Sequence, residues 1–180
     1  MKDKTVRWIG TVLLLSIPIL FSCASNHPMP SKQAEAYFNL GTEHLQQGEY
    51  DQAISDYNKA LEITPKYAEA YLNRGIAYRN KGQHDQAISD YGKVLQIDPK
   101  DARAYCNRGN AHLEKGRYDK AISDYSKALE INSKDAQVFY NRGVAYYFKF
   151  WEDIKKAQEL GFKIPPDLLD ELRKTSGRQK

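Results

Sequence analysis

Four histidines, two cysteines and a recurring aspartate are the side chains of this sequence best suited to metal binding or catalysis. The histidines show none of the close spacings that metal sites use: His27, His44, His84 and His112. Cys106 has no histidine or second cysteine near it in the sequence, so we interpret it as an inert small residue. The aspartates Asp56, Asp90 and Asp124 lie 34 residues apart, on what we expect to be separate helices. With no glycine-rich phosphate loop after a strand, the sequence predicts no catalytic residue, no metal site and no cofactor.

The 34-residue interval between the aspartates extends over most of the chain. Four glycines follow it, each with an asparagine two residues earlier: Gly41, Gly75, Gly109 and Gly143. Ten of the 13 tyrosines fall in four columns of the same repeat. This pattern resembles the tetratricopeptide repeat, a helix–turn–helix unit of 34 residues. The resemblance implies an all-α fold, a right-handed α-solenoid, with complete repeats at 34–67, 68–101 and 102–135.

The repeated columns also have a physical interpretation. A glycine ends each first helix, where it can adopt a left-handed conformation: Gly48, Gly82 and Gly116. Gly75 is small enough for two helices to approach closely, and Tyr91 fills the space between them. We expect each recurring aspartate to pair with an arginine of the following repeat, in the order Arg74, Arg108 and Arg142. Since each hairpin buries its apolar face only against its neighbours, several repeats are needed for stability.

The fourth repeat, residues 136–164, departs from the pattern. Residues 151–160 match residues 122–131 at an offset of 29 instead of 34, so the five residues of the turn between the helices are missing. Two outcomes are open: one long helix over about 136–160, or a tightened turn near Phe150 that restores the hairpin. A long helix would leave aromatic side chains for an oligomer surface, and hence for a homodimer: Phe148, Phe150 and Trp151.

The end of the chain, residues 165–180, predicts a capping helix and a frayed tail. Pro165 and Pro166 open the helix, and its leucines form an apolar stripe: Leu168, Leu169 and Leu172. Repeat arrays need such a terminal cap with a polar outer face.

The start of the chain predicts export. Residues 1–22 have a basic start and an apolar run of 13 residues, too short to span a membrane but the length of a signal-peptide core. The segment Leu20-Phe21-Ser22-Cys23 resembles the lipobox of bacterial lipoproteins. The resemblance implies an acylated Cys23, a linker over 23–33 and, because Ala24 is not the aspartate linked to inner-membrane retention, an outer-membrane position facing the periplasm. An uncleaved inner-membrane signal anchor is the alternative.

The repeat resemblance also implies a binding groove lined by the first helices. The columns that face the groove in this family hold, among others, Asn73, Arg79, Arg103, Asn107, Asn110, Tyr140, Asn141 and Tyr147. A ladder of asparagine amides can hydrogen-bond the backbone of an extended peptide, or asparagine can simply be tolerated at solvated positions. The family's clamp for chaperone C-terminal carboxylates is disfavoured, because its positions hold Phe38, Thr42 and Asn107.

These features predict a non-catalytic adaptor or scaffold tethered to the bacterial cell envelope. Its partner is a protein or peptide segment bound in the groove, and its lipid binds a membrane. The net charge of +4 without a dense basic stripe argues against nucleic acid. A structural protein that self-assembles through the fourth repeat is the alternative, and an enzyme is least favoured.

Overall fold

The computed structural model describes residues 29–175, and these residues form helices without strands. The helices are α1 (Lys32–Gln46), α2 (Tyr50–Ile63), α3 (Ala68–Asn80), α4 (His84–Ile97), α5 (Ala102–Glu114), α6 (Tyr118–Ile131), α7 (Ala136–Glu159) and α8 (Pro166–Thr175). The predicted signal over 1–22, Cys23, most of the linker and the end of the tail lie outside the described residues. Within the described part, no helix has the length and hydropathy needed to cross a membrane.

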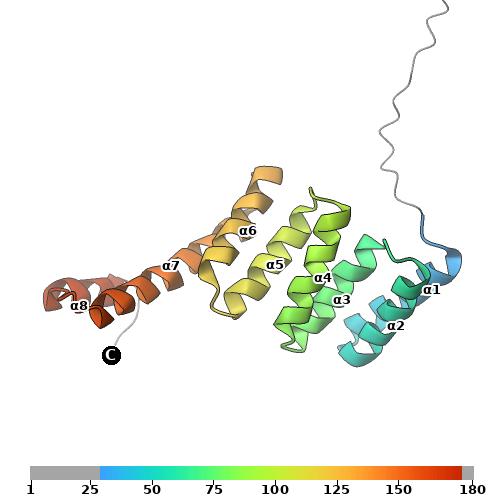
Figure 1. Ribbon diagram of the computed structural model, residues 1–180, viewed down its shortest axis with the longest axis horizontal. Coiled ribbons are helices and arrows are strands. Elements are labelled where there is room, and N and C mark those ends of the chain that lie inside the picture. The colour runs from blue at the N-terminus through green and yellow to red at the C-terminus, as the bar shows by residue number, and fades with distance from the viewer. Residues whose placement is uncertain (1–28, 176–180) are drawn as a thin grey trace, which may run out of the picture.

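The first six helices form three hairpins stacked side by side in an elongated array (Figure 1). The glycines predicted to end the first helices have positive φ angles of 78°, 74° and 67° at Gly48, Gly82 and Gly116. In the second hairpin, the Gln83 N–H donates back to the Tyr78 carbonyl at 2.8 Å, which closes the end of α3. The predicted all-α repeat fold is confirmed.

The core of each hairpin is a tyrosine of the second helix packed on a glycine of the first. A Cβ atom at Gly75 would lie 2.6 Å from the ring of Tyr91, and one at Gly109 would lie 2.8 Å from the ring of Tyr125. Tyr57, Tyr91 and Tyr125 are fully buried. The predicted close approach of the two helices is therefore present, and only glycine permits it.

The prediction that each recurring aspartate pairs with an arginine of the following repeat is wrong. Arg74 pairs with Asp90 of its own repeat at 2.7 and 2.8 Å, and Arg108 pairs likewise with Asp124 at 2.7 and 2.9 Å. Arg74 faces the preceding repeat as well, but there it donates to Asn58. Helices α3 and α5 each lie between two second helices, and the buried carboxylate that reaches their arginine comes from the second helix that follows.

A second set of charged residues links successive repeats. An aspartate of the preceding repeat pairs with Lys81 after the end of α3, with Lys115 after the end of α5 and with Lys149 near the middle of α7. The three ion pairs are Lys81–Asp51, Lys115–Asp85 at 2.6 Å and Lys149–Asp119 at 3.2 Å. All three carboxylates are largely exposed, so each pair contributes little stability by itself.

The fourth repeat contains one continuous helix, α7, of 24 residues. The tightened turn near Phe150 is therefore not formed. Phe150 occupies the column of the positive-φ glycines, and a phenylalanine does not readily adopt that conformation, so the helix continues. The first half of α7 packs on α6, and α8 follows near its far end (Figure 1). The capping role of α8 stays a prediction.

Candidate functional site on the wall of first helices

The first helices of the repeats form one continuous surface. Helix α3 contacts both α1 and α5, and α5 contacts α7, whereas the described second helices α2, α4 and α6 do not contact one another. We call the surface of α1, α3, α5 and α7 the inner wall. It carries the residues that the sequence predicts to bind a partner.

The two arginines predicted to face a partner, Arg79 and Arg103, are paired with carboxylates within the chain. Arg103 donates to Glu69 at 2.8 Å and to Asp101 at 2.7 Å, and these carboxylates, Asp101 first, raise the pKa of its guanidinium. Arg79 lies 3.8 Å from Glu114 and 3.5 Å from the Asn107 side-chain oxygen. An acidic ligand would therefore have to displace carboxylates that are already in place.

Asn107 and Arg103 line a pocket of about 240 Å³ at the junction of α5, α6 and α7. The rest of its lining is mostly small or apolar: Ala102, Cys106, Ala128, Asn132, Asp135 and Val138. Burial raises the pKa of the Cys106 thiol, so the thiol stays protonated and unreactive near neutral pH. The pocket has the size and chemistry to hold an apolar side chain beside a hydrogen-bonding amide.

Asn110 and Asn141 belong to an internal network. The Asn110 side-chain oxygen accepts from the Tyr125 hydroxyl at 2.7 Å and from the Asn141 amide at 3.0 Å. Gln137 in turn donates to the Asn141 oxygen at 2.9 Å. These bonds join α5, α6 and α7, so both asparagines serve the packing of the array as well as its surface.

The remaining predicted residues lie toward the two ends of the wall. Asn73 on α3 lies beside Tyr57; burial raises the pKa of this tyrosine, and contacts with Thr42 and Asn73 partly offset the effect. On α7, Tyr140 is 67% exposed, whereas Tyr147 makes edge contacts with Phe148 and Trp151. Tyr140 is thus the aromatic side chain that α7 presents most fully to solvent.

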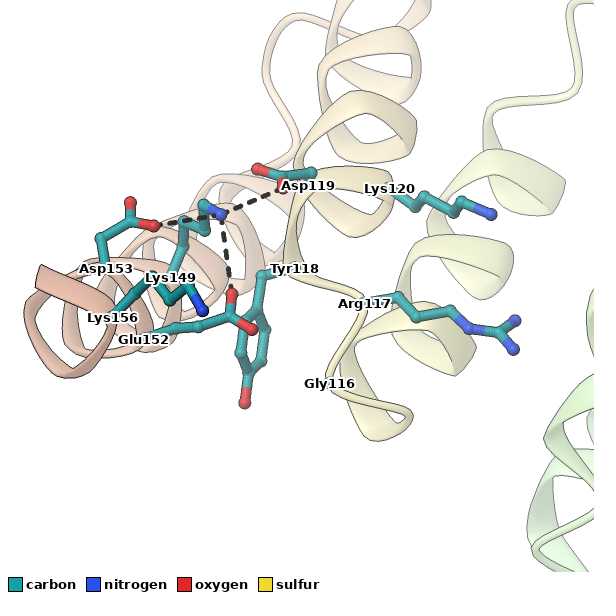
Figure 2. A pocket seen from close by; sticks show the side chains of 9 residues that line it. All are labelled: Gly116, Arg117, Tyr118, Asp119, Lys120, Lys149, Glu152, Asp153 and Lys156. Atoms are coloured by element: carbon teal, nitrogen blue, oxygen red, sulfur yellow. Dashed lines mark ion pairs between the residues drawn. The ribbon is translucent and has the colours of Figure 1, made fainter. Parts of the chain in front are cut away.

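A second pocket, of about 430 Å³, lies between the start of α6 and the second half of α7 (Figure 2). Figure 2 shows Lys149 at its centre, paired with Asp119, Glu152 and Asp153. The Asp119 and Asp153 carboxylates raise the pKa of Lys149, which keeps it charged. This site is not among those predicted from the sequence, although Lys81, Lys115 and Lys149 lie 34 residues apart.

The fold is shared with structurally known repeat domains. The second TPR domain of human RPAP3, solved with the HSP70 peptide SGPTIEEVD, is 22% identical, with a TM-score of 0.63 over 66% of this chain and 98% of that chain. The TPR2B domain of yeast Sti1, solved as a complex with pHsp70, is 24% identical, with a TM-score of 0.62 over 65% of this chain and 98% of that chain. At these identities the likeness shows the fold.

A closer sequence match among the solved structures is MamA. It is 38% identical over 58% of this chain and 61% of that chain, with a TM-score of 0.55. A comparison with curated proteins gives no match. The family model for the TPR repeat matches three overlapping segments, 41–82, 77–116 and 109–148, which together span more than half of the chain. The chain therefore belongs to the TPR repeat family.

Proposed function

We propose that the protein is a non-catalytic adaptor that binds a segment of a partner protein along its inner wall. The observation that carries this proposal is the continuous surface of α1, α3, α5 and α7, with a small apolar pocket at Asn107. The similar RPAP3 and Sti1 domains, solved with HSP70 partners, support peptide binding by this fold.

The chemistry of the wall favours an internal segment over a free C-terminus. The family's clamp for a terminal carboxylate is disfavoured, because Phe38, Thr42 and Asn107 hold its positions. Thr42 is also engaged, since it donates to the Phe38 carbonyl at 2.9 Å and accepts from the Tyr57 hydroxyl at 3.2 Å. An extended segment with an apolar side chain for the 240 Å³ pocket fits the groups that remain.

We also propose that the array is tethered to the bacterial cell envelope by a lipid on Cys23, at the outer membrane facing the periplasm. The lipobox-like segment before Cys23 supports this proposal. Helix α1 begins at Lys32 with Ser31 as its N-cap. The eight residue-to-residue steps from Cys23 to Ser31 span at most about 28 Å, so such a tether would hold the inner wall close to the membrane.

Site-specific photo-crosslinking in cells tests the adaptor function. A photoreactive residue at Tyr140 or Arg79 should capture the same partner protein, identified by mass spectrometry. A probe at Ser89, exposed on the second helix α4, is the matched control and should not capture it. Capture of that protein equally from Ser89, or of no protein from the wall, contradicts the proposal; capture of this chain alone favours self-assembly.

Fractionation tests the tether independently. Wild-type protein should sediment with membranes, and Cys23→Ser should move to the soluble fraction or remain as an unprocessed precursor with no lipid label. A Cys106→Ser variant controls for loss of a thiol. Membrane retention of fully processed Cys23→Ser protein contradicts a lipid anchor, and failure of this test leaves the crosslinking result standing.

A further inference from the structure

Helix α7 lacks the second helix that covers every other first helix. In repeat 3, a Cβ atom at Gly109 would meet the Tyr125 ring at 2.8 Å, whereas one at Gly143 would meet no atom within 4 Å. Around Gly143 lies an exposed stripe on one helix face, with Phe139 48%, Tyr146 54% and Phe150 41% exposed. Helix α8 does not take the missing place over Gly143, because a Cβ atom there meets no atom of the described residues within 4 Å.

The sequence of the missing second helix is nevertheless present. Residues 151–160 match residues 122–131 of α6 at an offset of 29. At this offset Ile154 corresponds to Tyr125, and Ala157 corresponds to Ala128, both of which are buried in the core of repeat 3. Because α7 is continuous, this segment cannot fold back onto Gly143 of its own chain.

We propose that two copies of the chain pair through α7, antiparallel and with two-fold symmetry. The second half of each α7 then serves as the second helix of the other copy's fourth repeat. Placing Ile154 of the second copy opposite Gly143 puts the symmetry axis between Phe148 and Lys149, close to the middle of α7 (Ala136–Glu159). The two helices therefore overlap along nearly their whole length of about 36 Å.

Charge complementarity supports this register. Arg74 and Arg108 each make two hydrogen bonds to a buried aspartate. Arg142, in the same column, donates to the Ser126 hydroxyl at 3.1 Å and stacks on Phe139, but it forms an ion pair with no carboxylate among residues 29–175. Asp153 corresponds to Asp124 at the offset of 29.

In the proposed register, Asp153 of the second copy approaches Arg142, and symmetry makes this contact twice. In the single chain, Asp153 is 63% exposed and contacts Lys149 of its own helix. A second copy both covers Gly143 and supplies a carboxylate for Arg142. Because a two-fold interface is reciprocal, each copy does this for the other. The occupant of the stripe is therefore a second copy of this chain.

Sedimentation of the full chain, purified in mild detergent, tests the pairing. We expect a dimer at micromolar concentration. Arg142→Glu and Asp153→Arg should each raise the dissociation constant by on the order of 30-fold or more, because each places like charges together. The double variant Arg142→Glu/Asp153→Arg should restore dimerisation, which a merely structural role of either residue would not produce.

Gly143→Leu is a second test that leaves the monomer intact. A Cβ atom at this position meets no atom within 4 Å in the single chain, so the unfolding temperature of the dilute monomer should be unchanged or slightly raised while dimerisation is lost. Lys155→Leu, on a residue whose side chain is 79% exposed, controls for an added leucine on α7. A wild-type chain that stays monomeric at about 200 micromolar, or a dimer unaffected by Gly143→Leu and by both charge reversals, overturns the proposal.

Discussion

At the scale of single residues, the three buried tyrosines differ in one hydrogen bond. The Tyr57 hydroxyl donates to Thr42, and the Tyr125 hydroxyl donates to Asn110. Thr42 and Asn110 occupy the same column of the repeat. In repeat 2 this column holds Ile76, and the buried Tyr91 hydroxyl has no hydrogen-bond partner among the described residues. A buried unpaired hydroxyl costs free energy of folding, so repeat 2 carries a local penalty that its neighbours avoid.

We predict that Tyr91→Phe leaves the free energy of unfolding unchanged or raises it, because the variant removes the unpaired hydroxyl and keeps the ring that packs on Gly75. Tyr125→Phe is the matched control and should lower it by about 1 kcal/mol, since Asn110 loses a donor. Urea denaturation at neutral pH measures both. Equal losses in the two variants would show that the Tyr91 hydroxyl has a partner in solution.

His112 gives the fold a dependence on pH. It is buried, its Nε2 lies 3.9 Å from an Asp124 oxygen, and burial lowers its pKa below the ordinary value. Asp124 favours the protonated form, whereas Arg108, Lys120 and Arg117 oppose it. The folded protein therefore binds fewer protons at this site than the unfolded chain does below pH 6.5.

We predict that stability falls as the pH drops below 6.5, by up to about 1.4 kcal/mol per pH unit from this one histidine. His112→Gln cannot titrate and should reduce the slope of unfolding free energy between pH 7 and pH 5. The measurement is chemical denaturation across that range. A slope equal to that of the wild type would place the pH dependence on another group.

At the scale of helices, the 34-residue spacing predicted most of the helices of the array, but it did not predict which side chains pair with one another. The glycine columns located the ends of α1, α3 and α5, because a positive φ requires glycine there. Spacing alone could not identify the second helix that supplies the carboxylate for Arg74, because Asp56 on α2 and Asp90 on α4 lie at similar separations from Arg74 in the sequence. The asparagine ladder was visible as a column, but the bond between Asn110 and Asn141 depends on side-chain geometry.

The fate of the fourth repeat depends on a deletion, so restoring the turn should restore the hairpin. We predict that inserting Gly-Arg-Tyr-Asp-Lys, the sequence of residues 116–120, between Lys149 and Phe150 brings Ile154 onto Gly143 within one chain. The exposed stripe is then covered internally, and the protein should become monomeric. Inserting five alanines instead lengthens the helix without a turn and is the control.

Cysteines at Gly143 and Ile154 distinguish the two states of the fourth repeat. In the parent chain these positions lie about 16 Å apart along one helix, so oxidation should link two chains. In the chain with the restored turn, oxidation should close a disulfide within one chain. An intermolecular link in both proteins would contradict a restored hairpin.

At the scale of the whole molecule, the proposed dimer places its axis at the end of the array opposite α1 (Figure 1). The portions of the inner wall on α1 and α3 lie away from that axis, and so does the start of α1 at Lys32, to which the proposed tether is joined. A dimer would thus offer two walls and two tethers. Two linked walls raise the apparent affinity for a partner that carries two binding segments, without any new contact.

The array should also unfold unevenly, because each repeat is held only by its neighbours. Helices α3 to α6 are flanked by helices on both sides, whereas the second half of α7 extends beyond the packed array (Figure 1). We predict the slowest amide hydrogen exchange in α4 and α5 and fast exchange over residues 150–159 in dilute monomer. Raising the protein concentration should slow exchange over 150–159 in the wild type but not in Gly143→Leu, because only a second copy covers that segment. Slow exchange there at all concentrations, in both proteins, would mean that the second half of α7 is protected within the single chain.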